Sequence, residues 1–188
     1  MPPKIKITKE QIIEVSLLMV RRGGEQELNA RSLAKELGSS TQPIFSNFEN
    51  MEKLRRAVLS RATDIYGEFI AEAVSSGKYP PYKASGMGYI RFAMREPNLF
   101  RMLFMCRREP GEQIPTPEYD GIVAQLVDGL GLTLDEARLF HFEMWALVHG
   151  IAVMAVTSYQ LLSIDTISQM LSDVYLGLKE RFLSRNDK

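Results

Sequence analysis

Apolar residues recur at the spacing of one α-helical face in almost every long segment of this chain. The sustained alternation of apolar and polar residues that marks a half-buried strand occurs nowhere. These two observations restrict the chain to the all-α fold class. We expect about nine helices, arranged as an N-terminal three-helix head followed by a larger C-terminal helical domain.

Residues that start and stop helices divide the head into three short segments. Thr8 and Gln11 fit the capping-box pattern, and Asn29 and Ser40 are suitable N-cap residues. Gly38 provides a C-terminal stop between the second and third helices. The expected helices run from about 8 to 22, from 29 to 37, and from Ser40 to Phe48 with Pro43 in the first turn.

Longer helices follow the head. Asn50 is a good N-cap for the first of them, and Thr133 with Glu136 forms a capping box before the most apolar segment. The expected helices lie at about 51–75, 82–95, 97–107, 118–130, 134–159 and 166–183, with a loop at 109–117. We therefore expect a helix-turn-helix domain over residues 1–50, extending into the helix from 51, and a second helical domain over 51–188.

The charge of the chain is unevenly distributed although its formal net charge is +0. Residues 1–56 hold 10 Lys and Arg against 7 Asp and Glu, or +3, which leaves 13 against 16, or −3, for the remainder. The single cysteine, Cys106, has no intrachain partner, as is usual in a reducing compartment. No apolar run approaches the length of a membrane span and the start lacks a signal-peptide pattern, so we expect a cytoplasmic protein.

The two short helices around Gly38 predict a helix-turn-helix over about 29–48, whose second helix fits the ~12 Å wide major groove of DNA. Within that helix Ile44 and Phe48 are spaced to pack inward. The outward side chains are then expected at base edges, and they are Thr41, Gln42, Phe45 and Ser46.

Other polar residues of the motif suit phosphate contacts, which position a protein on DNA without reading sequence. Asn47 and Lys53 are the clearest candidates. The full candidate set for DNA binding is Ser40, Thr41, Gln42, Pro43, Phe45, Ser46, Asn47 and Lys53. The alternative is that this helix-turn-helix is a packing motif with a merely polar surface.

Residues Thr8 to Val58 resemble the DNA-binding domain of the tetracycline-repressor family. Leu33-Ala34 and Leu37-Gly38 match the second-helix pattern, and residues 44–48 stand where the family typically has Leu-Tyr-Arg-His-Phe. The chain departs from that pattern at three positions, where Phe45 replaces Tyr, Asn47 replaces His and Met51 replaces a frequent Lys.

The resemblance implies a homodimer formed by the last two long helices, here about 134–159 and 166–183. Two-fold symmetry would present two recognition helices to half-sites ~34–36 Å apart, so a palindromic operator is expected.

Residues 96–104 and 145–150 are similar to the Trp-His-Gly subgroup of the family's C-terminal domains. This similarity implies a regulatory domain and identifies no ligand. Soft apolar and aromatic residues are candidates for lining a pocket for a hydrophobic effector, although each also suits an ordinary core. The selected set is Met102, Phe104, Met105, Phe142, Trp145 and His149, where His149 is expected to bond a buried backbone carbonyl instead.

Catalytic patterns are lacking in the sequence. The two histidines, His141 and His149, do not have the i, i+4 spacing of a helical metal pair, and Cys106 has no evident base. We expect no enzyme, no metal and no cofactor. The leading hypothesis is a homodimeric repressor released from DNA by a small hydrophobic effector; the alternative is a helical small-molecule or protein-binding module, and the sequence does not separate repressor from activator.

Overall fold

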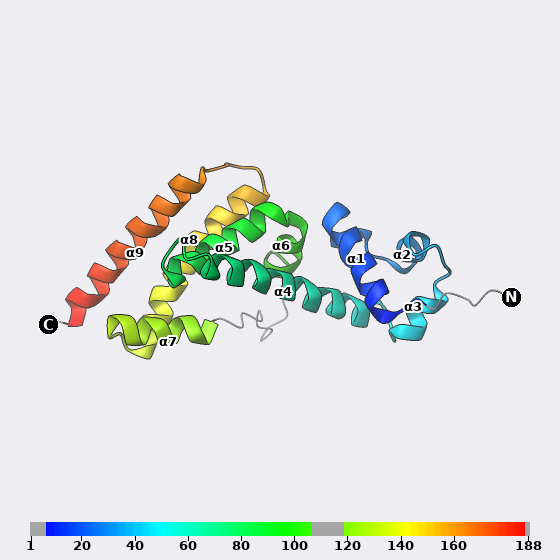
Figure 1. Cartoon of the computed structure of the whole chain (residues 1–188), viewed down its shortest axis with the longest axis horizontal. Coiled ribbons are helices and arrows are strands. Elements are labelled where there is room, and N and C mark those ends of the chain that lie inside the picture. The colour runs from blue at the N-terminus through cyan, green and yellow to red at the C-terminus, as the bar shows by residue number, and fades with distance from the viewer. Residues whose placement is uncertain (1–6, 107–118, 187–188) are drawn as a thin grey trace. The chain divides into compact units, whose positions relative to one another are not determined.

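The computed structural model describes residues 7–106 and 119–186, and helices account for 81% of them (Figure 1). No strand occurs within these ranges, so the predicted all-α class is confirmed. The α-helices found in the described residues are α1 (Lys9–Gly23), α2 (Ala30–Glu36), α3 (Gln42–Asn47), α4 (Met51–Ser75), α5 (Pro81–Arg95), α6 (Pro97–Phe104), α7 (Tyr119–Leu130), α8 (Leu134–Val156) and α9 (Ile164–Asn186).

Most helix starts follow the capping residues in the sequence. Thr8 and Thr133 each form a complete capping box, and the Asn29 side chain accepts a hydrogen bond from the Ser32 N–H. The start of α3 differs, because Thr41 rather than Ser40 is its N-cap and makes no side-chain capping bond. Pro43, at the second helical position, lacks the N–H that such a cap would use, and Ser40 Oγ accepts from the Gln42 N–H at 3.4 Å instead.

Helix ends are less well predicted than helix starts. α6 ends at Phe104 and α8 at Val156, both three residues before the expected position, whereas α9 begins two residues early at Ile164. Ser158 ends α8 by adopting a φ of 55°, and the Tyr159 N–H then bonds Met154 O at 3.0 Å. A serine in this left-handed conformation is uncommon, which is why the sequence pattern did not indicate a stop. The expected loop at 109–117 lies outside the described residues.

The chain forms two compact units. The first comprises the described parts of Met1–Gly67 and Glu96–Glu112, and the second those of Glu68–Arg95 and Gln113–Lys188. The first unit therefore contains α1, α2, α3, most of α4 and also α6. Its fully buried side chains include Ile12, Leu17, Val20, Leu33, Ile44, Leu54, Val58, Leu99 and Phe100. The boundary expected near residue 50 separates two functional domains, whereas these units are defined by packing. That boundary therefore stays a prediction.

A polar clamp joins α1 to α6 within the first unit. Arg21 donates two hydrogen bonds to the Glu96 carboxylate, from Nε at 2.9 Å and from Nη2 at 2.8 Å. Asn98 Nδ2 also donates to the Arg21 carbonyl oxygen at 2.9 Å. This bidentate geometry orients both side chains and fixes the start of α6 on the end of α1.

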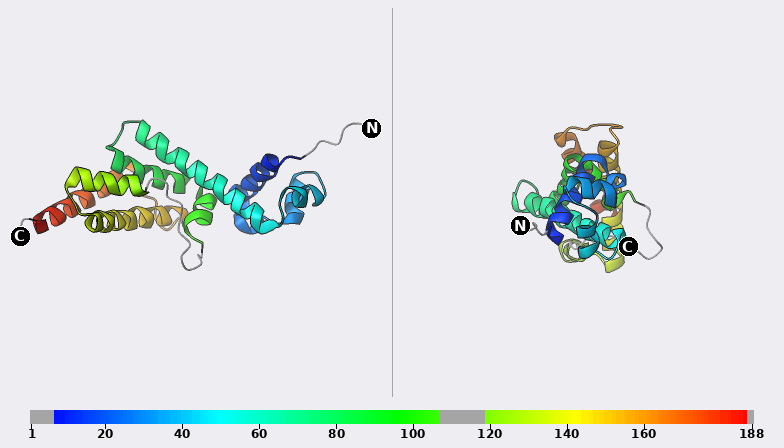
Figure 2. Two further views of the ribbon diagram at one scale, coloured as in Figure 1. Left: turned by 90° about the horizontal axis from the view of Figure 1, so that it is seen from below. Right: turned by 90° about the vertical axis from the view of Figure 1, so that its right-hand side faces the viewer.

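The second unit is built around α8, which packs along α5, α7 and α9 (Figure 2). Two tyrosine–histidine pairs join α5 to α8: Tyr82 Oη lies 3.3 Å from His141 Nδ1, and Tyr89 Oη lies 2.9 Å from His149 Nδ1. Because both pairs follow the same chain order, α5 and α8 run in the same direction here. Fully buried aromatic rings of this unit are Phe92, Phe140 and Phe182.

Close packing of α4 on α5 in the second unit depends on Gly88. A Cβ placed there would lie 3.0 Å from Ala73 Cβ and 3.1 Å from Phe69 O. We predict that Gly88→Ala lowers the free energy of unfolding by about 1–3 kcal/mol through overpacking. Gly129→Ala is the control, because nothing lies within 4 Å of its Cβ and alanine is better in a helix by up to about 1 kcal/mol. Urea unfolding at fixed protein concentration measures both; equal effects would contradict the packing argument.

Candidate nucleic-acid interface

The turn between α2 and α3 is a Schellman motif centred on Gly38. The Ser39 N–H bonds Ala34 O at 2.9 Å and the Gly38 N–H bonds Lys35 O at 3.1 Å, while Gly38 has a φ of 60°. A residue with a Cβ is strained at this φ. The predicted stop at Gly38 is therefore confirmed, and it sets the direction in which the chain enters α3.

α3 presents one buried edge and one exposed edge. Ile44 has no exposed surface and Phe48 is 5% exposed. The four residues expected at base edges, Thr41, Gln42, Phe45 and Ser46, are all exposed, and Phe45 leaves 48% of its surface open. The orientation of α3 is thus the one that DNA reading would require, while the roles of these residues stay predictions. Ser40 is also exposed and Pro43 is half-buried.

Asn47 is already bonded within the protein. Its side-chain Nδ2 donates to Pro43 O at 2.8 Å and to Ile7 O at 3.4 Å, and the residue is half-buried. A phosphate contact needs one of these two donor hydrogens. In the described structure Asn47 joins the end of α3 to the segment that precedes α1, and its phosphate role stays a prediction.

Exposed cations flank α3. Lys53 lies in the first turn of α4, where its backbone N–H donates to Asn50 Oδ1 at 2.9 Å, and its side chain makes no ion pair with the described residues. Arg31 and Lys35 on α2 are likewise exposed and make no ion pair within the described ranges. Lys9 lies with its Nζ 5.4 Å from the centre of the Phe48 ring. Sequence reasoning named Lys53 but missed the other three cations.

The residues expected to line an effector pocket fall into two separate groups. Met102, Phe104 and Met105 belong to the first unit, where Met102 is buried and the Phe104 ring meets Tyr66 edge-on at 5.3 Å. Phe142, Trp145 and His149 belong to the second unit as a stack on α8. The Phe142 and Trp145 ring centres are 6.0 Å apart and those of Trp145 and His149 are 4.8 Å apart. Whether either group binds a ligand stays a prediction.

His149 bonds a tyrosine hydroxyl rather than the backbone carbonyl expected from the sequence. Its Nδ1 lies 2.9 Å from Tyr89 Oη, and burial lowers the pKa of the imidazole, so the ring is held neutral. Burial also raises the pKa of Tyr89, an effect that a hydrogen bond with Trp145 partly opposes. Because an indole N–H only donates, Tyr89 accepts from Trp145 and can donate to His149. These polar groups satisfy each other between α5 and α8.

The residues that the structure describes form no metal site. Within 7–106 and 119–186, no group of three or more His, Cys, Asp or Glu residues is placed to hold a metal ion. Cys106 is exposed and not in a disulfide.

Comparisons with known proteins identify a related domain and a related regulator. Residues 82–172 match the family described as tetracyclin repressor-like, C-terminal domain. The chain is 25% identical over 157 residues to an uncharacterized helix-turn-helix-type transcriptional regulator of Mycobacterium tuberculosis, covering 81% of this chain and 72% of that protein. Residues 82–172 are thus similar to a tetracyclin repressor-like C-terminal domain, and the matches together support a DNA-binding transcriptional regulator.

A solved structure agrees with this assignment at the level of the fold. A chain from Pseudomonas aeruginosa PAO1, named as a candidate transcriptional regulator, superposes with a TM-score of 0.69 at 17% identity. The superposition covers 93% of this chain and 94% of the other. The predicted resemblance to the tetracycline-repressor family is confirmed by the match of residues 82–172, whereas the Trp-His-Gly subgroup stays a prediction.

The bonds of Asn47 give a test of its structural role in this regulator. Asn47→Ala removes two hydrogen bonds to backbone carbonyls, so we predict a loss of about 1–2 kcal/mol in the free energy of unfolding. Ser46→Ala is the matched control one residue earlier, since its exposed hydroxyl donates only to Gln42 O and its loss should change stability by less than about 0.5 kcal/mol. Urea unfolding would argue against the structural role if the two variants were equally stable.

Proposed function

We propose that this chain is a homodimeric, cytoplasmic repressor that binds a palindromic operator through α3 and leaves it when a small effector binds. The observation that carries the proposal is the exposed face of α3. Gln42, Phe45 and Ser46 are exposed on this face, whereas Ile44 on the opposite face is buried in the core. The family that it resembles consists of transcriptional regulators, so we expect no catalytic activity.

The chemistry of α3 suits the major groove. The Gln42 carboxamide matches the N6 and N7 edge of adenine, the Phe45 ring can contact a thymine methyl, and the Ser46 hydroxyl serves either a base or a phosphate. Lys53 supplies a charge at the start of α4, where free backbone N–H groups also favour a phosphate. Arg31 and Lys35 add positive charge from α2.

A second copy of the chain is the best occupant for the outer face of α8 and α9. Leu139, Phe142 and Leu176 expose 46%, 60% and 60% of their surface. Gly150 and Gly177 are also open, which permits close approach of another helix. α8 is moreover the one helix in the described ranges that is long and apolar enough to cross a membrane. Only 33% of its most apolar 18-residue stretch is buried. Packing against the same face of a partner would remove this apolar surface from water.

Operator binding is the first expected outcome. Purified protein is mixed with a pool of genomic fragments at two salt concentrations, and the retained duplex is footprinted. We predict a palindromic footprint and an affinity that falls steeply with salt. Gln42→Ala should cost about 1–3 kcal/mol and relax specificity at one base pair of each half-site.

Lys53→Ala should instead weaken binding to all sequences and reduce the salt dependence by about one ion per subunit. Lys179→Ala on α9 is the control and should leave the salt dependence unchanged. Binding that is weak, indifferent to sequence and unaffected by Gln42→Ala would favour an architectural helix-turn-helix in a small-molecule or protein-binding module.

Dimerisation through α8 and α9 is tested by Phe142→Glu. A charge at this exposed apolar position should convert the dimer to a monomer, because burying an unpaired carboxylate in an interface is costly. Operator affinity should fall with it, since one recognition helix then binds alone. The matched control is Leu18→Glu on α1, an equally exposed apolar residue at 57% that lies in the first unit. Light scattering after size-exclusion chromatography measures the molar mass of each variant. A Phe142→Glu variant that stays dimeric would exclude this interface.

A further inference from the structure

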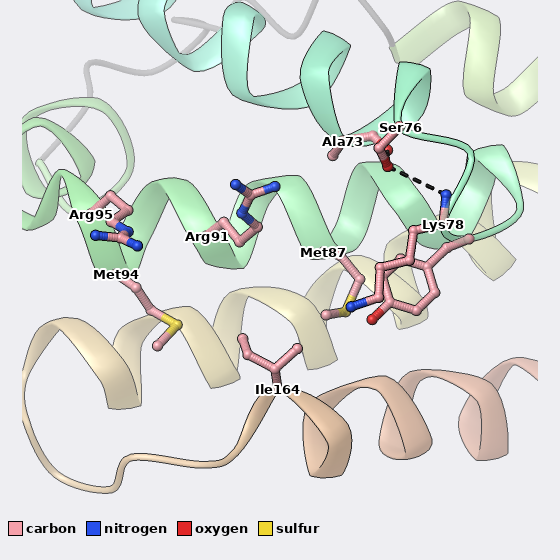
Figure 3. A pocket seen from close by; sticks show the side chains of 9 residues that line it. Ala73, Ser76, Lys78, Met87, Arg91, Met94, Arg95 and Ile164 are labelled. Carbon is pink, nitrogen blue, oxygen red and sulfur yellow. Dashed lines mark hydrogen bonds between the residues drawn. The ribbon is translucent and has the colours of Figure 1, made fainter.

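A cavity of about 510 Å³ lies in the second unit, between the end of α4, the outer face of α5 and the start of α9 (Figure 3). This volume is within the range of about 300–1,000 Å³ that is typical of small-molecule sites. None of the six residues selected from the sequence as effector ligands lines it. Its lining must therefore be judged from its own chemistry.

Three cations border the cavity: Lys78, Arg91 and Arg95. Arg91 Nη2 pairs with the Glu72 carboxylate at 3.1 Å, and this leaves its other guanidinium donors for a ligand. Arg95 makes no ion pair within the described residues. None of the lining residues is acidic and Glu72 offsets one of the three cations, so the lining carries a net positive charge.

The turn after α4 positions the third cation. Ser76 Oγ accepts a hydrogen bond from the Lys78 N–H at 3.3 Å, and Gly77 between them has a φ of 64° (Figure 3). The Lys78 ammonium lies 5.3 Å from the centre of the Tyr79 ring. Lys78 is thus held beside the cavity by a built turn rather than by chance placement of a flexible side chain.

The remaining lining is mostly apolar. Met87 and Met94 extend from α5 toward Ile164 at the start of α9, whereas Arg91 extends toward the α4 side (Figure 3). The spacing of residues 87, 91, 94 and 95 places these two kinds of side chain along one face of α5. Met94 and Ile164 are 41% and 37% exposed, which is apolar surface that a ligand would cover. Methionine side chains adapt readily to ligands of varied shape.

We propose that this cavity binds an amphiphilic organic anion, whose acidic headgroup pairs with Arg91 and Arg95 and whose apolar chain lies on Met87, Met94 and Ile164, with Lys78 at the other end of the lining. Guanidinium groups bind carboxylates through paired, charge-assisted hydrogen bonds, so a carboxylate is the best-matched headgroup. That this ligand is the effector rests on the proposed regulatory function; that the cavity binds it does not.

Binding of dodecanoate to the full-length protein is measured by isothermal titration calorimetry, at dodecanoate concentrations below those at which micelles form. We expect one dodecanoate per chain. Butyrate, which keeps the headgroup and loses most of the chain, should bind at least tenfold more weakly, as should dodecyltrimethylammonium, which keeps the chain and reverses the charge. Equal binding of either probe would overturn the assigned ligand class, and absence of dodecanoate binding would overturn the site.

Variants locate the binding within the molecule. Arg95→Gln should weaken dodecanoate about tenfold or more, because it removes a charge-assisted pair without disturbing a described ion pair. Met94→Gln should weaken it several-fold while leaving butyrate unaffected. Lys179→Gln, which removes a charge elsewhere in the second unit, should have no effect; if it weakens dodecanoate as much as Arg95→Gln does, the attraction is non-specific and the site is wrong. Thermal unfolding confirms that each variant is folded.

The effector role is decided separately on the footprinted operator. Dodecanoate should reduce operator affinity of the wild-type protein and act much less on Arg95→Gln. Binding at the cavity with unchanged operator affinity would overturn the effector role while the site stands. A chain that binds dodecanoate as described but no operator would overturn the repressor proposal instead.

Discussion

Ile44 has no exposed surface, and its insertion into the core of the first unit is the contact on which the candidate DNA-binding surface depends. With Phe48 buried four residues later, the rotation of α3 about its axis is fixed. Gln42, Phe45 and Ser46 must then face outward. A helix of only six residues has little stability of its own, so this packing and the Schellman turn at Gly38 hold it in place.

Features that depend on neighbouring residues were predictable from the sequence. The capping boxes at Thr8 and Thr133 each involve a partner three residues away, and the buried and exposed edges of α3 follow from helical spacing. The start of α3 was missed by one residue because Pro43 removes a donor that the usual cap employs. The end of α8 was missed because Ser158 takes a conformation that normally indicates glycine.

Features that depend on distant residues were not predictable. Arg21 and Glu96 are 75 positions apart, and Asn47 and Ile7 are 40 apart, so neither bond follows from a local pattern. The candidate cavity likewise combines the end of α4 and one face of α5 with Ile164. Sequence reasoning instead selected soft apolar residues and, for their polar tips, Trp145 and His149, which the structure stacks on each other while His149 bonds Tyr89. Apolar character alone did not separate a lining residue from one that packs inside the protein.

The order of residues along the chain suggests how a ligand in the cavity would affect the head. Arg95 borders the cavity, and the next residue is Glu96, whose carboxylate is held by Arg21 at the end of α1. Glu96 also precedes α6, whose Asn98 bonds the same arginine's backbone. Allosteric coupling typically requires about 1–3 kcal/mol, which is similar to the strength of a charge-assisted hydrogen bond. A ligand on Arg95 that weakened the Arg21–Glu96 clamp would need a coupling free energy of this size to change operator affinity by roughly 5–150-fold.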